Sequence, residues 1–331
     1  MEANKKDYRS IFGGDESLVI LGGNSNQPLF EEIAALLGKQ LGDVLVGRFP
    51  EGEIQVQIRE NVRGKDVFIV QSTCTPPNDN LMELLIMIDA AKRASAQRIT
   101  AVLPFFGYAR QDRKDKPRVP ITAKLVANLI TKAGADRVLT MDLHAGQIQG
   151  FFDIPVDHLY SINVLADYFK RNPLRNLMVV APDVGGTRMA RAYSKLLQSS
   201  FAIVDKRRES ASSTHVMNII GEVEGKNVLM VDDLISTGGS LVEAARALKR
   251  AGALEIDAAV VHPVLAGPAI ERIRQSDISK LVVTNSIPLA GEKRIDKIEQ
   301  VSVAPLLAEA IARIHAHVSI SSLFDQAGVE A

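Results

Sequence analysis

The chain has 331 residues, of which 46% are hydrophobic and 24% charged, and its 39 lysines and arginines equal its 39 aspartates and glutamates. This composition is ordinary for a globular protein, and the length suggests about two domains. A net charge of zero argues against a protein that binds nucleic acid through long-range attraction, so any basic site must be local.

The cysteine count and the hydropathy pattern favour the cytoplasm. Cys74 is the only cysteine in the sequence, so an intramolecular disulfide is impossible and a reducing compartment is expected. Residues 1–16 are polar and lack the apolar core of a signal peptide. No later apolar run is long enough to span a bilayer. We therefore expect a cytoplasmic protein that has no membrane partner.

Taken in chain order, short apolar strands alternate with helical patterns. The expected strands cover residues 18–21, 67–70, 99–103, 137–141, 177–181, 201–204, 228–231 and 258–261. The expected helices cover residues 29–41, 81–95, 121–133, 164–169 and 241–251. This alternation predicts an α/β architecture with helices beside mainly parallel sheets. Residues 54–60 differ, because their strict alternation of apolar and polar side chains indicates a half-exposed antiparallel strand.

The two halves of the chain share a short repeat. Residues 64–70 (GKDVFIV) parallel 225–231 (GKNVLMV), and residues 90–94 (AAKRA) parallel 247–251 (ALKRA). Chance similarity between two strand–helix units is the alternative. The shared Gly-Lys lead-in and Lys-Arg-Ala helix end favour duplication. We therefore expect two similar domains, at residues 1–160 and 161–304.

The clearest functional signal follows the expected strand at 228–231. Asp232 and Asp233 come directly after it, and a glycine-hydroxyl loop then leads into a helix; its residues are Ser236, Thr237, Gly238, Gly239 and Ser240. Backbone N–H groups at a helix start favour a phosphate monoester. The acidic pair suits sugar hydroxyls or a hydrated magnesium ion. The alternative is a capping box formed by Ser240 and Glu243.

The first half of the chain lacks these residues. Gln71 and Ser72 stand where the second half has its acidic pair, and residues 76–80 (PPNDN) replace the glycine-hydroxyl loop. Only the second half is therefore expected to hold a sugar phosphate, which leaves the first half for another substrate.

Further polar segments follow other expected strands. Residues 107–114 carry a basic run that can collect phosphate charge, although such runs are usually solvated loops. His144 follows the strand at 137–141, where ligand groups gather in α/β folds, although a lone histidine there is more often structural. Asp183 precedes two glycines and suits either a magnesium ligand or a helix N-cap. Residues 205–214 begin basic, turn small and polar, and indicate a mobile loop.

These segments together resemble the ribose-phosphate diphosphokinase family, which has the phosphoribosyltransferase fold. The resemblance runs from about Leu18 to Phe324, and the motifs occur in the family's order. It implies two similar phosphoribosyltransferase-type domains, each a mainly parallel sheet flanked by helices, with residues 305–331 joining the first. It also implies transfer of the diphosphoryl group of ATP to the C1 hydroxyl of ribose 5-phosphate, with Mg2+ as cofactor. The implied assembly is a homo-oligomer, typically a hexamer.

The resemblance also assigns roles to residues. The nucleotide segments of the family match Phe49, Glu51, Gly52, Glu53, Arg110, Gln111 and Asp112. The metal positions match His144 and Asp183. The ribose 5-phosphate positions match Arg208, Asp232, Asp233 and the loop from Ser236 to Ser240. Lys206 and Arg208 match the catalytic loop and would neutralise charge that develops in the transition state.

Two positions depart from the family pattern. Met189 stands where an arginine is common, with Arg188 one place earlier, and Ser236 stands where an aspartate is common. We expect phosphate binding to survive with altered strength, because Ser236 can still donate a hydrogen bond. Two rival functions remain: a phosphoribosyltransferase that consumes 5-phosphoribosyl diphosphate, and a non-catalytic homologue that regulates a true synthetase. The regulatory class, such as phosphate activation or ADP inhibition, does not follow from the sequence.

Overall fold

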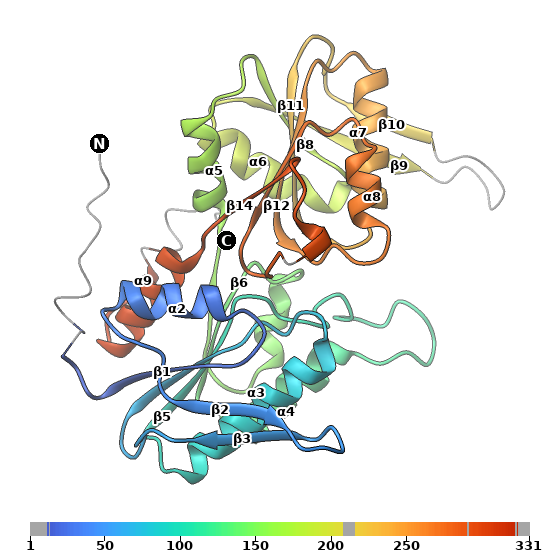
Figure 1. Ribbon diagram of the computed structural model, residues 1–331. Helices are drawn as coiled ribbons and strands as arrows, with labels where there is room; N and C mark the ends of the chain where they lie inside the picture. The colour runs from blue at the N-terminus through green and yellow to red at the C-terminus, as the bar shows by residue number, and fades with distance from the viewer. Residues whose placement is uncertain (1–11, 13, 208–215, 290, 322, 324–331) are drawn as a thin grey trace. The chain divides into compact units, whose positions relative to one another are not determined.

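The computed structural model describes residues 12, 14–207, 216–289, 291–321 and 323, and the contacts between them form two compact units (Figure 1). The first unit contains the chain up to Tyr160 together with Ser286–Pro288 and Val303–Leu323. The second contains Ser161–Asn285 and Leu289–Ser302. Each unit has its own sheet and its own hydrophobic core. Among the described helices, none combines the length and the apolar character needed to cross a membrane.

A parallel sheet forms the centre of the first unit. Its strand order is β1-β4-β5-β6-β7. The strands are β1 (Leu18–Gly22), β4 (Asp66–Val70), β5 (Arg98–Leu103), β6 (Arg137–Met141) and β7 (Val156–Leu159). Every residue of β1 and β4 is buried, as expected for apolar strands that are covered on both faces. Because all five strands run in one direction, their carboxyl ends lie at one edge of the sheet.

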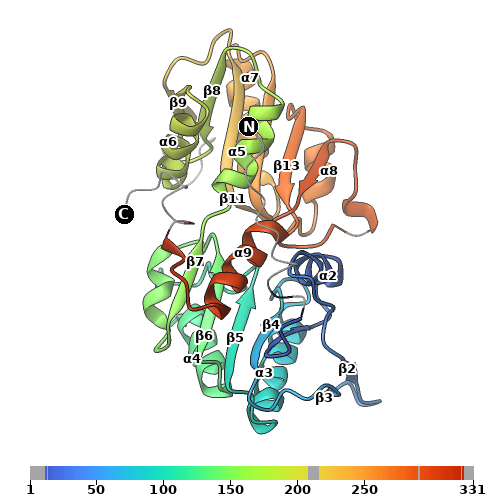
Figure 2. The same cartoon turned by 90° about the vertical axis from the view of Figure 1, so that its left-hand side faces the viewer.

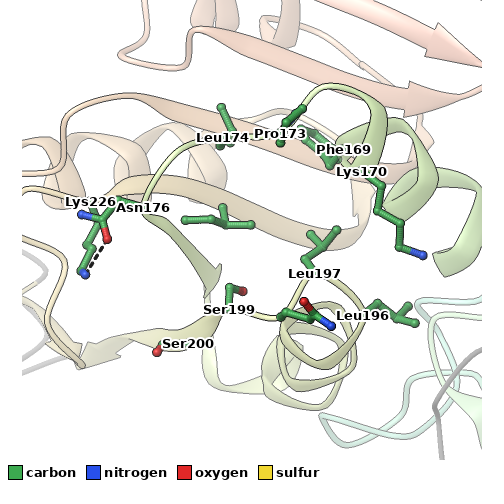
Figure 3. Close-up of a pocket in the computed structure, with 12 residues that line it drawn as sticks. Phe169, Lys170, Pro173, Leu174, Asn176, Leu196, Leu197, Ser199, Ser200 and Lys226 are labelled. Atoms are coloured by element: carbon green, nitrogen blue, oxygen red, sulfur yellow. Dashed lines mark hydrogen bonds between the residues drawn. The ribbon is translucent and has the colours of Figure 1, made fainter.

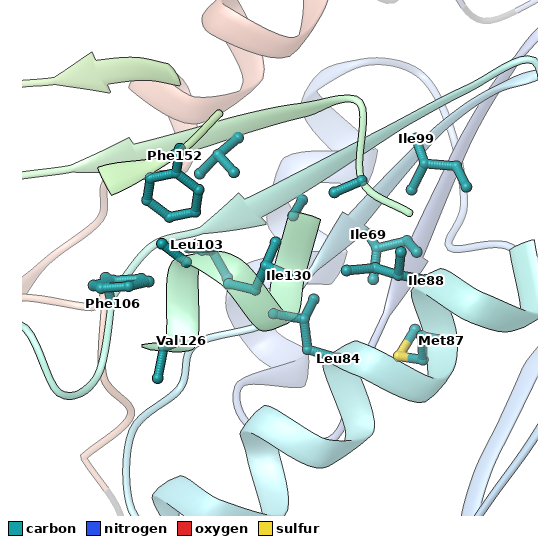
Figure 4. Packing of buried hydrophobic residues seen from close by; sticks show 14 of the residues in the cluster. Ile69, Leu84, Met87, Ile88, Ile99, Leu103, Phe106, Val126, Ile130 and Phe152 are labelled. Atoms are coloured by element: carbon teal, nitrogen blue, oxygen red, sulfur yellow. The ribbon is translucent and has the colours of Figure 1, made fainter. Parts of the chain in front are cut away.

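Helices cover both faces of this sheet. On one face, α3 (Pro77–Arg93) and α4 (Thr122–Ala133) contribute to a core that includes Ile69, Leu84, Met87, Ile88 and Ile130 (Figure 4). On the other face, α2 (Gln27–Leu36) and α9 (Ala304–His315) pack against each other (Figure 2). The expected helix at 29–41 therefore ends too late. Gly38 adopts a left-handed conformation, φ 71°, which terminates α2.

A two-stranded antiparallel sheet lies beside α3 in the first unit. It pairs β2 (Val44–Arg48) with β3 (Ile54–Ile58), so that Val46 lies opposite Val56. Most of its residues are half-buried. The predicted half-exposed antiparallel strand at 54–60 is confirmed, although it ends at Ile58 and its partner β2 was not predicted.

The second unit has a mainly parallel sheet of the order β10-β9-β8-β11-β12-β13-β14. Its strands are β8 (Leu177–Ala181), β9 (Ser200–Arg207), β10 (Val216–Ile220), β11 (Asn227–Ile235), β12 (Ile256–Pro263), β13 (Lys280–Thr284) and β14 (Ile298–Val301). Only the β9–β10 pair of this described sheet is antiparallel. The helices beside it are α5 (Ile162–Arg171), α6 (Thr187–Leu196), α7 (Gly239–Arg250) and α8 (Ala269–Arg274). The predicted α/β fold of helices beside parallel sheets is confirmed.

The sequence repeat is matched by a repeat in backbone hydrogen bonding. Gly64 and Gly225 both have left-handed backbones, φ 70° and 68°. The amide of Gly64 donates to the carbonyl of Ser95, and that of Gly225 donates to Gly252, each at 2.9 Å. Ser95 and Gly252 follow the two Lys-Arg-Ala helix ends and are themselves left-handed, φ 64° and 89°. The β4–α3 and β11–α7 units are thus built on one local plan, which supports duplication over chance similarity.

Candidate functional site

Strand β11 is longer than the sequence predicted, and it includes the acidic pair. Asp232 and Asp233 lie within the strand, since Asp232 pairs with Val260 of β12 and β11 continues to Ile235. The expected strand at 228–231 is therefore too short. Pairing with β12 extends it, and both carboxylates stand at the carboxyl edge of the second sheet, where α/β folds bind ligands.

The glycine-hydroxyl loop connects β11 to α7, and the capping-box alternative is wrong. The helix begins at Gly239 and its N-cap is Gly238, so Ser240 lies inside the first turn. Gly238 has φ 73°, which suits glycine. The carbonyl of Ser236 accepts from the amide of Ala266, and that of Thr237 accepts from Arg272, at 2.9 and 3.0 Å. The carbonyls are thereby held while the first amides of a twelve-residue helix stay available to an anion.

Three carboxylates gather at this edge of the second unit. Oδ1 of Asp232 accepts from the amide of Asp233 at 2.9 Å. Burial first, then the neighbouring Asp233 and Asp183 carboxylates, raise the pKa of Asp232 to about 8. A bound cation, or sugar hydroxyls that donate hydrogen bonds, would favour the charged form. The acidic edge therefore gains electrostatic stabilisation from such ligands.

Asp183 takes one of the two roles that were open for it, the helix N-cap, and its role as a magnesium ligand stays a prediction. It is the N-cap of the short helix η2 (Val184–Gly186), where its Oδ1 accepts from the amide of Gly186 at 3.1 Å. It is also exposed, and its charge acts on Asp232. Of the two family departures nearby, Arg188 is exposed on α6 and Met189 is half-buried there.

The first unit anchors both predicted nucleotide segments on the start of α3. Phe49 is 42% exposed in the turn between β2 and β3, and its neighbour Arg48 forms a 2.9 Å ion pair with Asp79. Tyr108, beside the second segment, donates a hydrogen bond to Asn78. Two segments that are distant in sequence are therefore tied to consecutive residues of one helix.

The turn at 49–53 is compact and presents its side chains to solvent. The amide of Gly52 donates to the carbonyl of Phe49 at 2.9 Å, and Gly52 has φ 98°. Glu51 and Glu53 are exposed. Solvent-facing carboxylates and an exposed aromatic ring are available to contact a base.

Asp112 links the second nucleotide segment to the loop that carries His144. Its Oδ2 accepts from Gln147 at 2.9 Å, and Gln147 lies in η1 (Gly146–Phe151), directly after that loop. Gln111 accepts from the hydroxyl of Thr122 at the start of α4. Arg110 is exposed, and so is His144. Asp112 is thus joined to η1, which directly follows the loop that carries His144.

The two predicted metal ligands belong to different units. His144 belongs to the first unit and Asp183 to the second. Within the described parts of the chain, no group of three or more His, Cys, Asp and Glu side chains is arranged to hold a metal ion. Magnesium usually binds one or two carboxylates plus substrate phosphates. The exposed Asp183 beside a proton-retaining Asp232 fits that mode, whereas a complete protein cage does not.

The segment predicted to be catalytic is described only in part. Lys206 lies in β9 opposite Met217 of β10, so the expected strand at 201–204 is too short and residues 205–207 are strand rather than loop. Arg208, like the rest of the predicted loop up to residue 214, lies outside the described residues. The antiparallel pairing with β10 was not predicted.

A separate hollow of about 710 Å³ lies at the opposite edge of the second sheet (Figure 3). It is lined by residues at the starts of β8 and β9, such as Leu177 and Ser200, and by Leu174 and Leu197. Lys226 donates to Asn176 at its rim, at 2.8 Å. None of the predicted site residues lines it.

Comparisons with known proteins agree along nearly the whole chain. Residues 18–134 match the N-terminal domain of ribose phosphate pyrophosphokinase, and residues 210–325 match the phosphoribosyl synthetase-associated domain. Ribose-phosphate pyrophosphokinase of Bacillus caldolyticus is 57% identical over 302 residues, which are 91% of this chain and 96% of that protein. That of Chlorobaculum tepidum is 58% identical over 311 residues, 94% and 96%. A crystal structure of phosphoribosylpyrophosphate synthetase from Mycobacterium smegmatis has a TM-score of 0.86 and 39% identity, and covers 91% of this chain and all of that one.

Proposed function

This chain belongs to the ribose-phosphate pyrophosphokinase family, and on that premise we propose how its residues divide the work of the reaction. The enzyme is an ATP-dependent diphosphotransferase. It transfers the diphosphoryl group of ATP to the C1 hydroxyl of ribose 5-phosphate, giving 5-phosphoribosyl diphosphate and AMP. Identity that extends over more than nine tenths of the chain carries this conclusion and disfavours the phosphoribosyltransferase alternative.

Ribose 5-phosphate is proposed to bind at the carboxyl edge of the second sheet. The loop from Ser236 to Ser240 would hold the 5-phosphate through the first amides of α7 and its hydroxyls. Asp232 and Asp233 would accept hydrogen bonds from the ribose hydroxyls. The raised pKa of Asp232 supports this placement, because hydroxyl donors stabilise a carboxylate that burial and its neighbours have destabilised.

ATP is proposed to bind the first unit. Phe49 would stack on the adenine, with Glu51, Gly52 and Glu53 beside it, and Arg110, Gln111 and Asp112 would meet the rest of the nucleotide. The anchoring of both segments at the start of α3 supports a common site. The two units are accordingly proposed as an ATP domain and a ribose 5-phosphate domain.

His144 and Asp183 are proposed to hold Mg2+, which when bound would offset the charge of the triphosphate. Lys206 and Arg208 would neutralise charge that develops as the C1 oxygen meets the β-phosphorus and the bond to the α-phosphate oxygen breaks. No described side chain is assigned as general base. The rate enhancement would come mainly from positioning and charge compensation.

One assay tests the function and its remaining rival. The protein is mixed with magnesium, ATP and ribose 5-phosphate, with and without inorganic phosphate, and the nucleotide product is identified. AMP that appears only with the sugar phosphate establishes diphosphoryl transfer. ADP would mean ordinary γ-phosphoryl transfer. Binding of both substrates without turnover would support the regulatory homologue instead.

A homo-oligomer is also proposed, a hexamer by the family resemblance. Light scattering of the purified protein should then give about six times the 35.9 kDa of one chain. A mass equal to one chain at assay concentration would contradict it.

A further inference from the structure

The buried side chain of His158 lies against the loop that carries His144. His158 is in β7 and only 3% exposed. Its Nε2 accepts a hydrogen bond from the amide of Leu143 at 2.9 Å. The backbone ladder between β6 and β7 ends as the amide of Asp142 donates to the carbonyl of Leu159, also at 2.9 Å. The next amide, that of Leu143, lies beyond the last backbone hydrogen bond between the two strands, and the imidazole accepts it instead of a carbonyl.

His158 also contacts the far side of the same loop. Its Nδ1 is 3.1 Å from the side-chain amide of Gln149 in η1, and Gln149 in turn donates to the carbonyl of Gly146 at 3.0 Å. The ring of Tyr160 packs on the imidazole with 4.6 Å between ring centres. One buried side chain thus joins the two ends of the 142–146 loop, and that ring has little freedom to turn.

The direction of these hydrogen bonds fixes the form of the imidazole. A backbone N–H can only donate, so Nε2 of His158 carries no proton. The neutral ring then bears its proton on Nδ1, which lies 3.1 Å from the side-chain amide of Gln149.

The backbone between these anchors has a conformation that neighbours must hold. Asp142 has φ 43°, in the left-handed region that non-glycine residues occupy only when their surroundings support it. His144, two residues later, is exposed. The direction in which His144 projects therefore depends on the anchored residues immediately before it.

We propose that His158 is a positioning residue for His144: its neutral imidazole accepts the amide of Leu143 and so holds the 142–146 loop in the shape that presents His144 to the magnesium–nucleotide complex. This rests on the role of His144 in the proposed function. His158 itself touches no substrate. We expect its effect on the ATP side of the reaction, because its contacts with Leu143, Gln149 and Tyr160 lie within the first unit.

Two variants of the full-length enzyme separate the acceptor from the bulk of the ring. His158→Leu keeps apolar volume but removes the acceptor, and His158→Gln restores an acceptor. We expect His158→Leu to lower kcat/KM for ATP roughly 10- to 100-fold, the usual effect of a misplaced reacting group, with KM for ribose 5-phosphate changed less than about twofold. His158→Gln should recover most of the loss. Equal losses for both substrates, or no recovery by His158→Gln, would overturn the proposal.

A double-mutant cycle tests the route of the effect. If His158 acts through His144, adding His158→Leu to His144→Ala should change kcat/KM for ATP by less than about twofold, because the two changes remove one interaction. Losses that multiply would show that His158 acts elsewhere. Should His158→Leu not fold, Gln149→Leu removes the opposite anchor from a half-buried position and should give the same substrate selectivity with a smaller loss.

A readout independent of turnover distinguishes this inference from the proposed function. Hydrogen exchange of the peptide that spans residues 142–146 should be faster in His158→Leu than in the native chain and slow again in His158→Gln. If the native enzyme made no AMP while this exchange pattern held, the proposed function would fail and the loop anchor would stand. Unchanged hydrogen exchange in His158→Leu would contradict the proposal that His158 holds the 142–146 loop.

Discussion

The β4–α3 and β11–α7 units share the backbone hydrogen bond that joins the start of the strand to the end of the helix. They differ at the carboxyl ends of their strands. At the end of β4, Gln71 is fully buried, accepts from the hydroxyl of Ser25 at 2.7 Å and donates to Glu83 at 2.8 Å. Ser72 donates to the carbonyl of Ser286, which belongs to the same unit. At the corresponding end of β11, Asp232 lies among carboxylates that raise its pKa. The first copy uses its own chain to satisfy its polar groups, whereas the second has an acidic side chain whose ionised form a ligand can stabilise.

A second contrast concerns how each unit treats buried acids. In the first unit Asp66 pairs with Arg98 and with His315, whose other ring nitrogen meets Asp15 at 2.9 Å. This cluster lies at the amino edge of the sheet, away from the nucleotide segments. In the second unit Asp232 and Asp233 stand at the carboxyl edge, although a further buried acid, Asp257, lies near the amino end of β12. The cluster around Asp66 is expected to stabilise the fold, and Asp232 and Asp233 are proposed to provide binding.

Gln71→Glu breaks the first contrast most severely. A carboxylate at Gln71 would face Glu83 across 2.8 Å in a fully buried position. Because two buried acids without a cation repel each other, we expect the free energy of unfolding to fall by about 3–5 kcal/mol. Urea titration at fixed protein concentration measures it, and Gln71→Met, which loses only hydrogen bonds, should cost about 1–3 kcal/mol. A stable variant that gained a second ribose 5-phosphate site would contradict our account of the two copies.

Lys206→Ala tests whether charge compensation in the second unit is realised in the transition state. Loss of a group that acts there should lower kcat by about 100- to 1,000-fold, while ribose 5-phosphate affinity changes less than about tenfold. Turnover and equilibrium binding measure the two effects. Lys195, exposed on α6, supplies the matched control, and Lys195→Ala should leave both near native values. Equal losses in kcat and affinity would contradict the role assigned to Lys206.

Much of the fold follows from the sequence because central strands carry their own signal. Strands such as β1 and β4 are buried at every position and apolar apart from Asp66, and both were placed within one residue at each end. The edge strand β14 was missed because its residues are exposed or half-buried. Strand β10 was missed because it is defined by its antiparallel pairing with β9, which the sequence does not show. β13 was also missed, although it lies between β12 and β14 and four of its five residues are buried, so a short apolar run alone does not identify every central strand. Elements that depend on a distant neighbour need the tertiary structure.

The same limit applies to the site. The glycine-hydroxyl loop is visible because its chemistry is local. The position of Asp232 inside β11 is not, because it depends on pairing with Val260. His158 gave no signal, since its partner Leu143 is fifteen residues away and meets it only after β6 and β7 pair. The roles of the predicted site residues stay predictions until the substitutions are made.

His315→Leu breaks the compensated cluster of the first unit. The hydrogen bond to Asp66 raises the pKa of His315, and hydrogen bonds from Ser17 and then His315 lower that of Asp15 to about 2. Burial opposes ionisation of Asp66, but His315 and Arg98 hold its pKa below the usual value. We expect a loss of about 1–3 kcal/mol near pH 6, as one partner of a part-buried group is removed. The control is His317→Asn, because His317 is exposed and has φ 54°, a conformation that asparagine tolerates.

The pH dependence of this cluster has a definite sign. A raised histidine pKa stabilises the fold fully below the unfolded value, about 6.5, and the benefit disappears as pH rises through the folded value. A lowered aspartate pKa stabilises above about 3.8, and the benefit disappears as pH falls toward 2. The contribution is therefore greatest between about pH 4 and 6.5. The native chain and His315→Leu should differ most in that window, and a difference that grows toward pH 9 would refute the assignment.

Asp232→Asn should have the smallest effect on stability and the opposite sign. Because the folded pKa, about 8, lies above the unfolded value of 3.8, the folded protein binds the extra proton, and the ligand-free fold loses stability as pH rises between those values. Asparagine removes that dependence, so the free energy of unfolding at pH 8 should rise by about 1–2 kcal/mol. Ribose 5-phosphate affinity should fall at the same time, by roughly tenfold, since a neutral amide accepts sugar hydroxyls less strongly than a carboxylate does. Thermal melts at pH 5 and 8 and a binding isotherm measure the two effects. A variant that lost stability at pH 8 while keeping its affinity would contradict this prediction. The acids at the end of β11 would then support the fold, as those of the first unit do. The difference between the two copies would not be one of function.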